Sequence, residues 1–244
     1  MVDETSNKNK SVSKSESKVE KLSTDYERPA VTVDIVIFTI KSGELKVLLI
    51  KRHIQPFKDK WAIPGGFVGI SQSLDDAAKF KLEQKTGVKD VYLEQLYTFG
   101  DPNRDARGRV ITVTYFALIN SDTILLKNGK DGKDDFEAEW FSISKMPSLA
   151  FDHKLIMEYA LKRLKWKFEY TTVAFSLLPK KFTMTQLQEL YEVVFVEKFD
   201  KRNFRKKILS LEILEEQEVM RNVSFRPPQL YSLKAGIGEI VNIL

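Results

Sequence analysis

Cysteine is absent from this chain of 244 residues, and histidine occurs only as His53 and His153. Without thiols there can be no disulfide, no zinc–thiolate site and no cysteine nucleophile. The two histidines lie far apart in the sequence, which disfavours a histidine-based metal cluster. The chain also lacks an apolar run near the roughly 20 residues of a membrane span, and its N-terminus lacks the apolar core of a secretion signal. These absences predict a soluble, cytoplasmic protein.

The charge balance is mildly basic. Lysine and arginine outnumber the acids by 39 to 34, and the formal net charge is +5. Such a balance favours a polyanionic partner only if the positive charge is concentrated at one place. The length allows one large domain or two ordinary ones. Residues 1–27 are rich in Ser, Lys and Glu and hold almost nothing to bury, so we predict a disordered leader there.

Glutamate is also missing from particular positions of one segment whose small and apolar residues follow a known motif. Residues 64–88 read PGGFVGISQSLDDAAKFKLEQKTGV and resemble the Nudix box of diphosphate hydrolases. Counted from Gly66, the small and apolar positions of that box hold Leu82, Gly87 and Val88. The four positions for Glu hold instead Gln72, Lys81, Gln84 and Lys85, and the position for Arg holds Phe80. The frame of the motif is present while its charged residues are not.

Losing these glutamates changes what the segment can bind. In the family pattern they lie on one face of a helix and hold Mg²⁺, which neutralises a diphosphate and activates water. We therefore predict neither catalytic nor metal-ligating residues here. Lys81 and Lys85, one helical turn apart, could contact a diphosphate directly, so the hypothesis is binding without hydrolysis. The alternative is that both lysines are ordinary solvated residues of the helix surface.

Residues 28–169 have the pattern of one mixed α/β domain. VTVDIVIFTI and LKVLLIKR, separated by KSGE, predict a β-hairpin that feeds a buried sheet. Further strands are expected at VYLEQLYTFGD, VITVTYFALIN and EWF. Amphipathic helices are expected over residues 74–85 and 153–167. The predicted fold class is α/β, with a Nudix-like α/β/α sandwich.

Residues 170–244 have a different pattern. QLQELYEVVF predicts a first helix, capped by Thr183 or Thr185, and Asp200 caps a second helix in KRNFRKKILSL. The segment VMRNVSFRPPQLYSLK then predicts a hairpin with a basic tip. Two short helices followed by a hairpin predict a C-terminal winged helix-turn-helix domain.

The second of these helices is strongly basic, because five of the seven residues from Lys201 to Lys207 are Lys or Arg. A recognition helix in the major groove needs cations for phosphate and Arg or Asn for base edges. Arg202 and Asn203 are the predicted base readers. The complete set of predicted DNA contacts is Lys180, Lys181, Thr183, Thr185, Lys201, Arg202, Asn203, Arg205, Lys206, Lys207 and Arg226. Arg226 lies near the predicted hairpin tip, where Arg221 could also reach the DNA as part of a wing. The alternative is a solvated basic helix.

Taken together, the degenerate box, the loop GDPNRDARGR, the helix LAFDHKLIMEYALKRL and the basic helix resemble the Nudix-related transcriptional regulators of the NrtR type. The resemblance implies a homodimer that binds a double-stranded DNA operator and requires no cofactor. It also implies a Nudix domain that senses a nucleotide such as ADP-ribose and controls NAD or sugar metabolism. The expected ligand contacts are Arg52, Lys81, Lys85, Arg104, Arg107 and Arg109. For the loop arginines, pairing with Asp101 and Asp105 is the alternative.

Two other classes of function stay open from the sequence. A true Nudix hydrolase acting on a substrate such as ADP-ribose would need replacement metal ligands, and Asp75, Asp76, Glu94 and Glu139 are the candidates. None of them has the spacing of the family. A protein-interaction module would bind neither DNA nor a small molecule. Salt-dependent binding to heparin or to an operator would distinguish it from the regulator.

Overall fold

A sheet built around the central strand β1 organises the N-terminal half of this computed structural model, which describes residues 28–87, 89, 91–120, 126, 137–220 and 227–244. Within these residues the sheet has seven strands in the order β3-β2-β1-β6-β5, with β4 pairing to β1 and β7 to β2. The strands are β1 Ala30–Lys41, β2 Glu44–Lys51, β3 Trp61–Ala62, β4 Gly65–Phe67, β5 Tyr92–Phe99, β6 Val110–Leu118 and β7 Glu137–Ser142. The antiparallel β1–β2 pair confirms the predicted hairpin.

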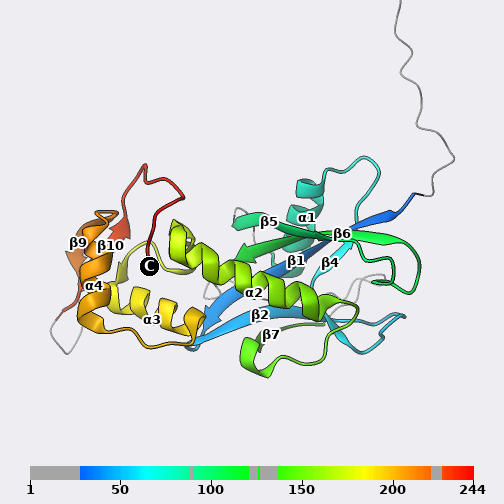
Figure 1. The fold of residues 1–244 in the computed structure, drawn as a ribbon, viewed down its shortest axis with the longest axis horizontal. Helices are drawn as coiled ribbons and strands as arrows, with labels where there is room; N and C mark the ends of the chain where they lie inside the picture. The colour runs from blue at the N-terminus through cyan, green and yellow to red at the C-terminus, as the bar shows by residue number, and fades with distance from the viewer. Residues whose placement is uncertain (1–27, 88, 90, 121–125, 127–136, 221–226) are drawn as a thin grey trace, which may run out of the picture.

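Helices cover both faces of this sheet (Figure 1). Helix α1, Leu74–Thr86, packs on one face through Ala77, Ala78 and Leu82. Helix α2, His153–Tyr170, packs on the other face through Ile156, Leu164 and other apolar residues, after a short 3-10 turn at Ile143–Lys145. Because both faces are covered, β1 reads as a nearly continuous apolar run. The predicted α/β/α sandwich is confirmed.

The C-terminal part is a small winged helix. After the 3-10 helix Thr172–Leu177 come β8 Phe182–Thr183, α3 Met184–Phe195, α4 Lys201–Ser210, β9 Leu214–Val219 and β10 Gln229–Leu233. The strands form a sheet in the order β8-β10-β9. Thr183 caps α3 in a capping box with Gln186, and the Asp200 side chain accepts from the Asn203 N–H at the start of α4. Both helix starts were therefore predicted correctly.

The predicted hairpin needs one correction. Its first strand is the acidic segment LEEQEV at Leu214–Val219, whereas the sequence pattern had placed its start at Val219. β9 is an edge strand, so most of its side chains face solvent and no apolar alternation marks it. The predicted wing residues Arg221 and Arg226 lie outside the described residues, as does the predicted leader 1–27.

One hydrophobic core runs through both parts at the end of α2. The ring of Tyr191 in α3 lies 5.2 Å from that of Phe168 in α2, and its hydroxyl donates to the Phe168 carbonyl at 3.1 Å. The chain end also returns to α2, where the N–H of Val241 donates to Tyr170 and that of Ile243 to Glu169. Among the described residues, no helix is long and apolar enough to cross a membrane.

Candidate functional site

A pocket of about 400 Å³ opens beside β1 in the sheet domain. The close approach of β4 to β1 shapes it, because a side chain at Gly65 would place its Cβ only 2.1 Å from the Asp34 carboxylate. The polar and charged residues that line it are Thr32, Asp34, Arg52, Lys81, Arg104, Asp105, Arg107 and His153. They come from β1, the residue that follows β2, α1, the loop after β5 and the start of α2.

Asp34 forms the buried acidic floor of this pocket. Its Oδ2 accepts a hydrogen bond from Thr112 Oγ1 at 2.8 Å and lies 3.7 Å from the guanidinium of Arg104. Burial removes water from the carboxylate and raises its pKa to about 6, against the lowering effects of Thr112 and Arg104. Both of these contacts involve Oδ2, so the other carboxylate oxygen of Asp34 is available to a ligand.

His153 and Arg104 hold the floor in place. The N–H of Ile63 donates to His153 Nδ1 at 2.9 Å, so the neutral ring carries its proton on Nε2, 4.0 Å from Asp34 Oδ2. Burial lowers the pKa of His153 to about 3 and keeps the ring neutral. Arg104 donates twice to Asp152, at 2.9 and 2.7 Å, which ties the loop after β5 to the start of α2.

The rim of the pocket combines cations with aromatic faces. The guanidinium of Arg107 lies 5.3 Å from the ring centre of Phe67 and 5.5 Å from that of Phe151. Arg52 lies 4.6 Å from the same Phe151 ring. Partial burial and the nearby Arg107 lower the pKa of Arg52, as expected where positive charges crowd together. Such a rim fits an anionic ligand that also has a flat ring.

Four of the six predicted ligand contacts line this pocket, namely Arg52, Lys81, Arg104 and Arg107. Arg109 does not, because its guanidinium donates to the Gly100 carbonyl at 2.6 Å and faces a neighbouring hollow of about 500 Å³. The sixth predicted contact, Lys85, does not line this pocket either. It is buried in α1, one turn farther from the Gly65–Gly66 turn than Lys81.

The arrangement does not fit a Mg²⁺ ion. The Lys81 side chain crosses directly over Gly66, the first glycine of the box, where a Cβ would lie 3.2 Å from the ammonium nitrogen. Within the described part of the chain, no three His, Asp or Glu side chains gather as a metal ion would need. Glu83, the one glutamate in the box segment, pairs with Lys89 at 3.0 Å.

The proposed replacement ligands are dispersed as well. Asp75 accepts from the Tyr115 hydroxyl at 2.6 Å, and Asp76 accepts from the Ser73 hydroxyl at 2.7 Å. Glu94 pairs with Lys167 at 2.7 Å, on the other side of the sheet from α1. Glu139 lies on β7, which is not part of the pocket. These four acids do not form a catalytic cluster.

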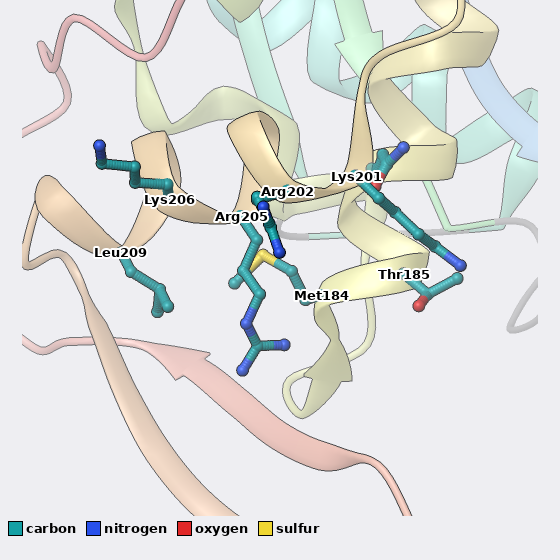
Figure 2. Close-up of a pocket in the computed structure, with 8 residues that line it drawn as sticks. Met184, Thr185, Lys201, Arg202, Arg205, Lys206 and Leu209 are labelled. Carbon is teal, nitrogen blue, oxygen red and sulfur yellow. The ribbon is translucent and has the colours of Figure 1, made fainter.

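A second hollow, of about 540 Å³, lies between α3 and α4 in the winged helix. Figure 2 shows the basic side chains of α4 ranged along it beside Met184 and Thr185 of α3. Its lining includes Lys201, Arg202, Arg205 and Lys206. We call this surface the basic groove. It faces outward because Phe204 and Ile208 turn the opposite side of α4 into the core.

The predicted DNA contacts separate into several groups. Thr185 and four cations of α4 line the basic groove, whereas Asn203 and Lys207 are exposed but do not line it. Thr183 is buried and caps α3. Lys181 pairs with Glu218 at 2.8 Å, and Lys180 lines a different hollow, at the junction with the sheet domain. The predicted base readers Arg202 and Asn203 therefore do not share one surface.

Sequence reasoning missed several residues of both sites. In the pocket these are Thr32, Asp34, Phe67 and Phe151, and in the basic groove Gln188 and Leu209. One signal was available, because Asp34 is a single acid inside the apolar run VTVDIVIF. Tyr231 was missed too, and its hydroxyl receives a hydrogen bond from Arg205 at 3.0 Å, which orients that cation beside the groove.

Comparison with known proteins agrees with this two-part architecture. The NUDIX domain model matches residues 28–164, and the NrtR DNA-binding winged helix domain model matches residues 174–233. The ADPR responsive transcriptional repressor NtrR of Acinetobacter baylyi is 38% identical over 211 residues, which is 85% of this chain and 83% of that protein.

Solved structures agree with it as well. The crystal structure of Shewanella oneidensis NrtR complexed with a 27mer DNA has a TM-score of 0.71 and 36% identity, covering 84% of this chain and 93% of that one. The NUDIX domain of the same NrtR complexed with ADP ribose has a TM-score of 0.50 and 37% identity, covering 57% and 90%. The chain belongs to the NrtR family of ligand-responsive DNA-binding transcriptional regulators, with a Nudix domain joined to a winged helix.

Proposed function

We propose that this regulator binds ADP-ribose in the pocket beside β1 without hydrolysing it, and that the ligand changes the affinity of the basic groove for an operator. One observation carries the proposal: a cationic pocket whose lining offers no metal cluster shares a chain with a winged helix. Two relatives support the choice of ligand. The Acinetobacter protein is an ADPR responsive repressor, and the Shewanella NUDIX domain forms a complex with ADP ribose.

Binding without hydrolysis follows from the charges that have replaced the box glutamates. A diphosphate needs compensation of its negative charge, and Lys81 and Arg52 supply that charge directly, beside Arg107, which is paired with Asp105. What they do not supply is a metal-activated water. Incubating the full chain with ADP-ribose and Mg²⁺ or Mn²⁺ should therefore give no AMP. Turnover at ordinary enzyme rates would overturn this part of the proposal and favour the hydrolase.

Helix α2 provides a direct physical connection between the two sites. Its 18 residues correspond to a length of about 27 Å. At its start, Asp152 and His153 contact the pocket through Arg104 and Ile63. At its end, Phe168 packs against Tyr191 of α3, the helix that shares the basic groove. A shift of α2 on ligand binding would therefore move the winged helix.

Residues after β10 also contact α2. The Lys167 ammonium of α2 pairs with Glu239 at 2.9 Å, a residue that follows β10. The same ammonium pairs with Glu94 of β5, and β5 leads directly into the loop that carries Arg104 and Arg107. Ligand control requires unequal affinity for two arrangements of these parts, because equal binding shifts nothing. We propose that the ion pairs of Lys167 with Glu94 and Glu239 differ between the arrangement that binds DNA and the one that does not.

The decisive experiment titrates ADP-ribose into a complex of the full chain with a fluorescent operator duplex. A change in DNA affinity by at least about fivefold, the lower range of allosteric coupling, is expected. AMP at the same concentration serves as the ligand control, since it lacks the diphosphate and the second ribose. An unchanged affinity at millimolar ADP-ribose would exclude that effector.

We also propose the remaining features that the family resemblance implies. The sensing unit is taken as 28–169 and the DNA-binding unit as 170–244, which agrees with the separate family matches. A homodimer would present two basic grooves to one operator, and light scattering of the full chain tests its mass. The regulated genes would serve NAD or sugar metabolism, which the neighbouring genes would indicate.

A further inference from the structure

We propose that Asp34 recognises the terminal ribose of the effector, so that the pocket selects nucleotides ending in a free sugar over those ending in phosphate. The inference rests on the proposed function and assigns a place to each part of the ligand. It concerns a residue at the pocket floor that neither the box nor the predicted arginines include.

The first observation is an acceptor left open to the pocket. Oδ2 of Asp34 is occupied, because Thr112 donates to it and Arg104 lies beside it. Oδ1 lies over Gly65 instead, and no described residue donates a hydrogen bond to it. Asp34 lines the pocket with only 10% of its side chain exposed. This oxygen is therefore an acceptor to which a ligand in the pocket can donate a hydrogen bond.

The second observation concerns Thr32, which lies two residues earlier on β1 and therefore on the same face of the strand. It lines the pocket as well, and its hydroxyl is buried with no hydrogen-bond partner. The floor thus offers a carboxylate acceptor and a hydroxyl that can donate or accept. Their closest match is a polyol, whose hydroxyl groups also do both.

The third observation is a separation of charge with depth. At the floor, Arg104 has 4% of its side chain exposed and is neutralised by Asp152 and Asp34, while His153 is neutral. At the rim, Arg107 has 39% of its side chain exposed and pairs with Asp105 at 2.6 Å, as the alternative for the loop arginines predicted. Arg52 and Lys81 also line the pocket, and the hydrogen bonds from Arg52 go to carbonyl groups of the chain. Among the cations of the pocket, Arg52 and Lys81 therefore carry the positive charge that no described acid pairs with, and Arg52 lies at the rim beside Phe151.

These charges dictate the orientation of a ligand with a diphosphate in its middle. Phosphate would be repelled by the buried carboxylate of Asp34 and attracted by the rim cations. The exposed ring of Phe67 and the ring of Phe151 also lie at the rim, where an adenine can stack. What remains for the floor is the terminal ribose, and a carboxylate that accepts from ribose hydroxyls is a common arrangement in nucleotide-binding sites.

The test is calorimetric titration of the full chain with ADP-ribose and with ADP, which lacks the terminal ribose. The wild-type protein should prefer ADP-ribose by about tenfold or more, as expected for hydrogen bonds to a buried charge. Asp34→Asn should remove most of that preference while the affinity for ADP stays equal or rises. Asp76→Asn, an exposed acid in the first turn of α1, is the matched control and should leave both affinities unchanged.

The possible outcomes separate the two proposals. If the wild-type protein binds neither nucleotide, the proposed function fails and the inference fails with it. If ADP-ribose binds but Asp34→Asn retains the full preference, or weakens both nucleotides equally, only the inference is overturned. Equal affinity of the wild-type protein for ADP and ADP-ribose would overturn it as well, and that comparison does not depend on whether the variant folds.

Discussion

The two sites of this molecule use positive charge in opposite ways. In the pocket beside β1, the arginine closest to the floor, Arg104, is buried and bound twice to the Asp152 carboxylate, so its position is fixed before any ligand binds. In the basic groove, every charged residue of α4 is exposed, and among these residues, within the part of the chain that the structure describes, only the Arg205 side chain makes a hydrogen bond, to Tyr231. The first arrangement favours selection of one small ligand. The second favours attraction of a long polyanion and adjustment to its surface.

The largest effect should come from reversing charge in the basic groove. Arg202→Glu with Arg205→Glu replaces two cations by two anions where phosphate would approach, and operator affinity should fall by at least about a hundredfold. ADP-ribose binding should not change, because the pocket is remote. Fluorescence anisotropy with an operator duplex and calorimetry with ADP-ribose measure the two affinities.

The matched control for this change is Lys154→Glu with Lys162→Glu on α2. Both lysines are exposed cations that line neither the pocket nor the basic groove. This double variant carries the same change in net charge and should bind the operator within a fewfold of wild type. Equal losses in the two double variants would mean that total charge, rather than the surface of α4, governs binding.

The next effect tests the pre-formed nature of the pocket. Arg104→Ala removes a buried cation and leaves Asp152 and Asp34 without compensation, which should cost about 3 kcal/mol or more in the free energy of unfolding. Arg109→Ala in the same loop removes only a bond to the Gly100 carbonyl and should cost about 1 kcal/mol or less. Urea titrations of both variants measure the difference. Similar costs would show that the pairing of Arg104 adds nothing to the fold.

This contrast also explains how much the sequence could predict. Local signals were sufficient for Thr183 and Asp200, because a helix cap depends on residues within one turn. The basic groove was predicted from the run in α4 for the same reason. The sequence indicated that Phe204 packs into the core, but it did not show where α3 lies relative to α4. The absence of Asn203 from the groove lining could therefore not be predicted.

The pocket could be predicted only in part, because distant segments build it. Asp34 comes to line the pocket because β4 pairs with β1 at Asp34 and Gly65 and because the loop after β5 brings Arg104 within 3.7 Å. None of these contacts follows from the spacing of the box. The sequence could not show that Lys85 stays outside the pocket, because the helical period predicts which face a residue takes but not how far along the helix the pocket extends. Acidic β9 escaped notice since an edge strand needs no apolar alternation.

A smaller effect should distinguish the sites by their response to salt. The affinity of the operator should fall steeply between about 50 and 200 mM salt, since each phosphate neutralised by the groove releases counterions. Lys206→Ala should reduce the slope of log affinity against log salt concentration by about one. The affinity for ADP-ribose should change far less, because a single diphosphate has no condensed counterion layer to release, whereas the duplex does. Equal slopes for DNA and ADP-ribose would remove the distinction between the two sites.

The smallest effect concerns how much the buried carboxylate of Asp34 lowers the stability of the folded protein. Burial raises the pKa of Asp34 to about 6 from its usual 3.8, so the folded protein binds a proton more readily than the unfolded chain between these values. The ionised carboxylate therefore destabilises the fold above about pH 6, and this cost disappears as the pH falls toward about 4. Asp34→Asn should melt a few degrees above wild type at about pH 7.5 and at nearly the same temperature at about pH 4.

His153 must be considered in this comparison because it titrates in the opposite sense. Its pKa is lowered from 6.5 to about 3 in the folded protein, so its contribution to stability is lost as the pH falls below 6.5. Both proteins carry His153, and its contribution cancels in the difference between their melting temperatures. Asp76→Asn should show no such pH-dependent difference. If Asp34→Asn were less stable than wild type at neutral pH, the carboxylate would stabilise the fold. The contrast between a pocket floor that lowers stability and an exposed groove that does not would then fail.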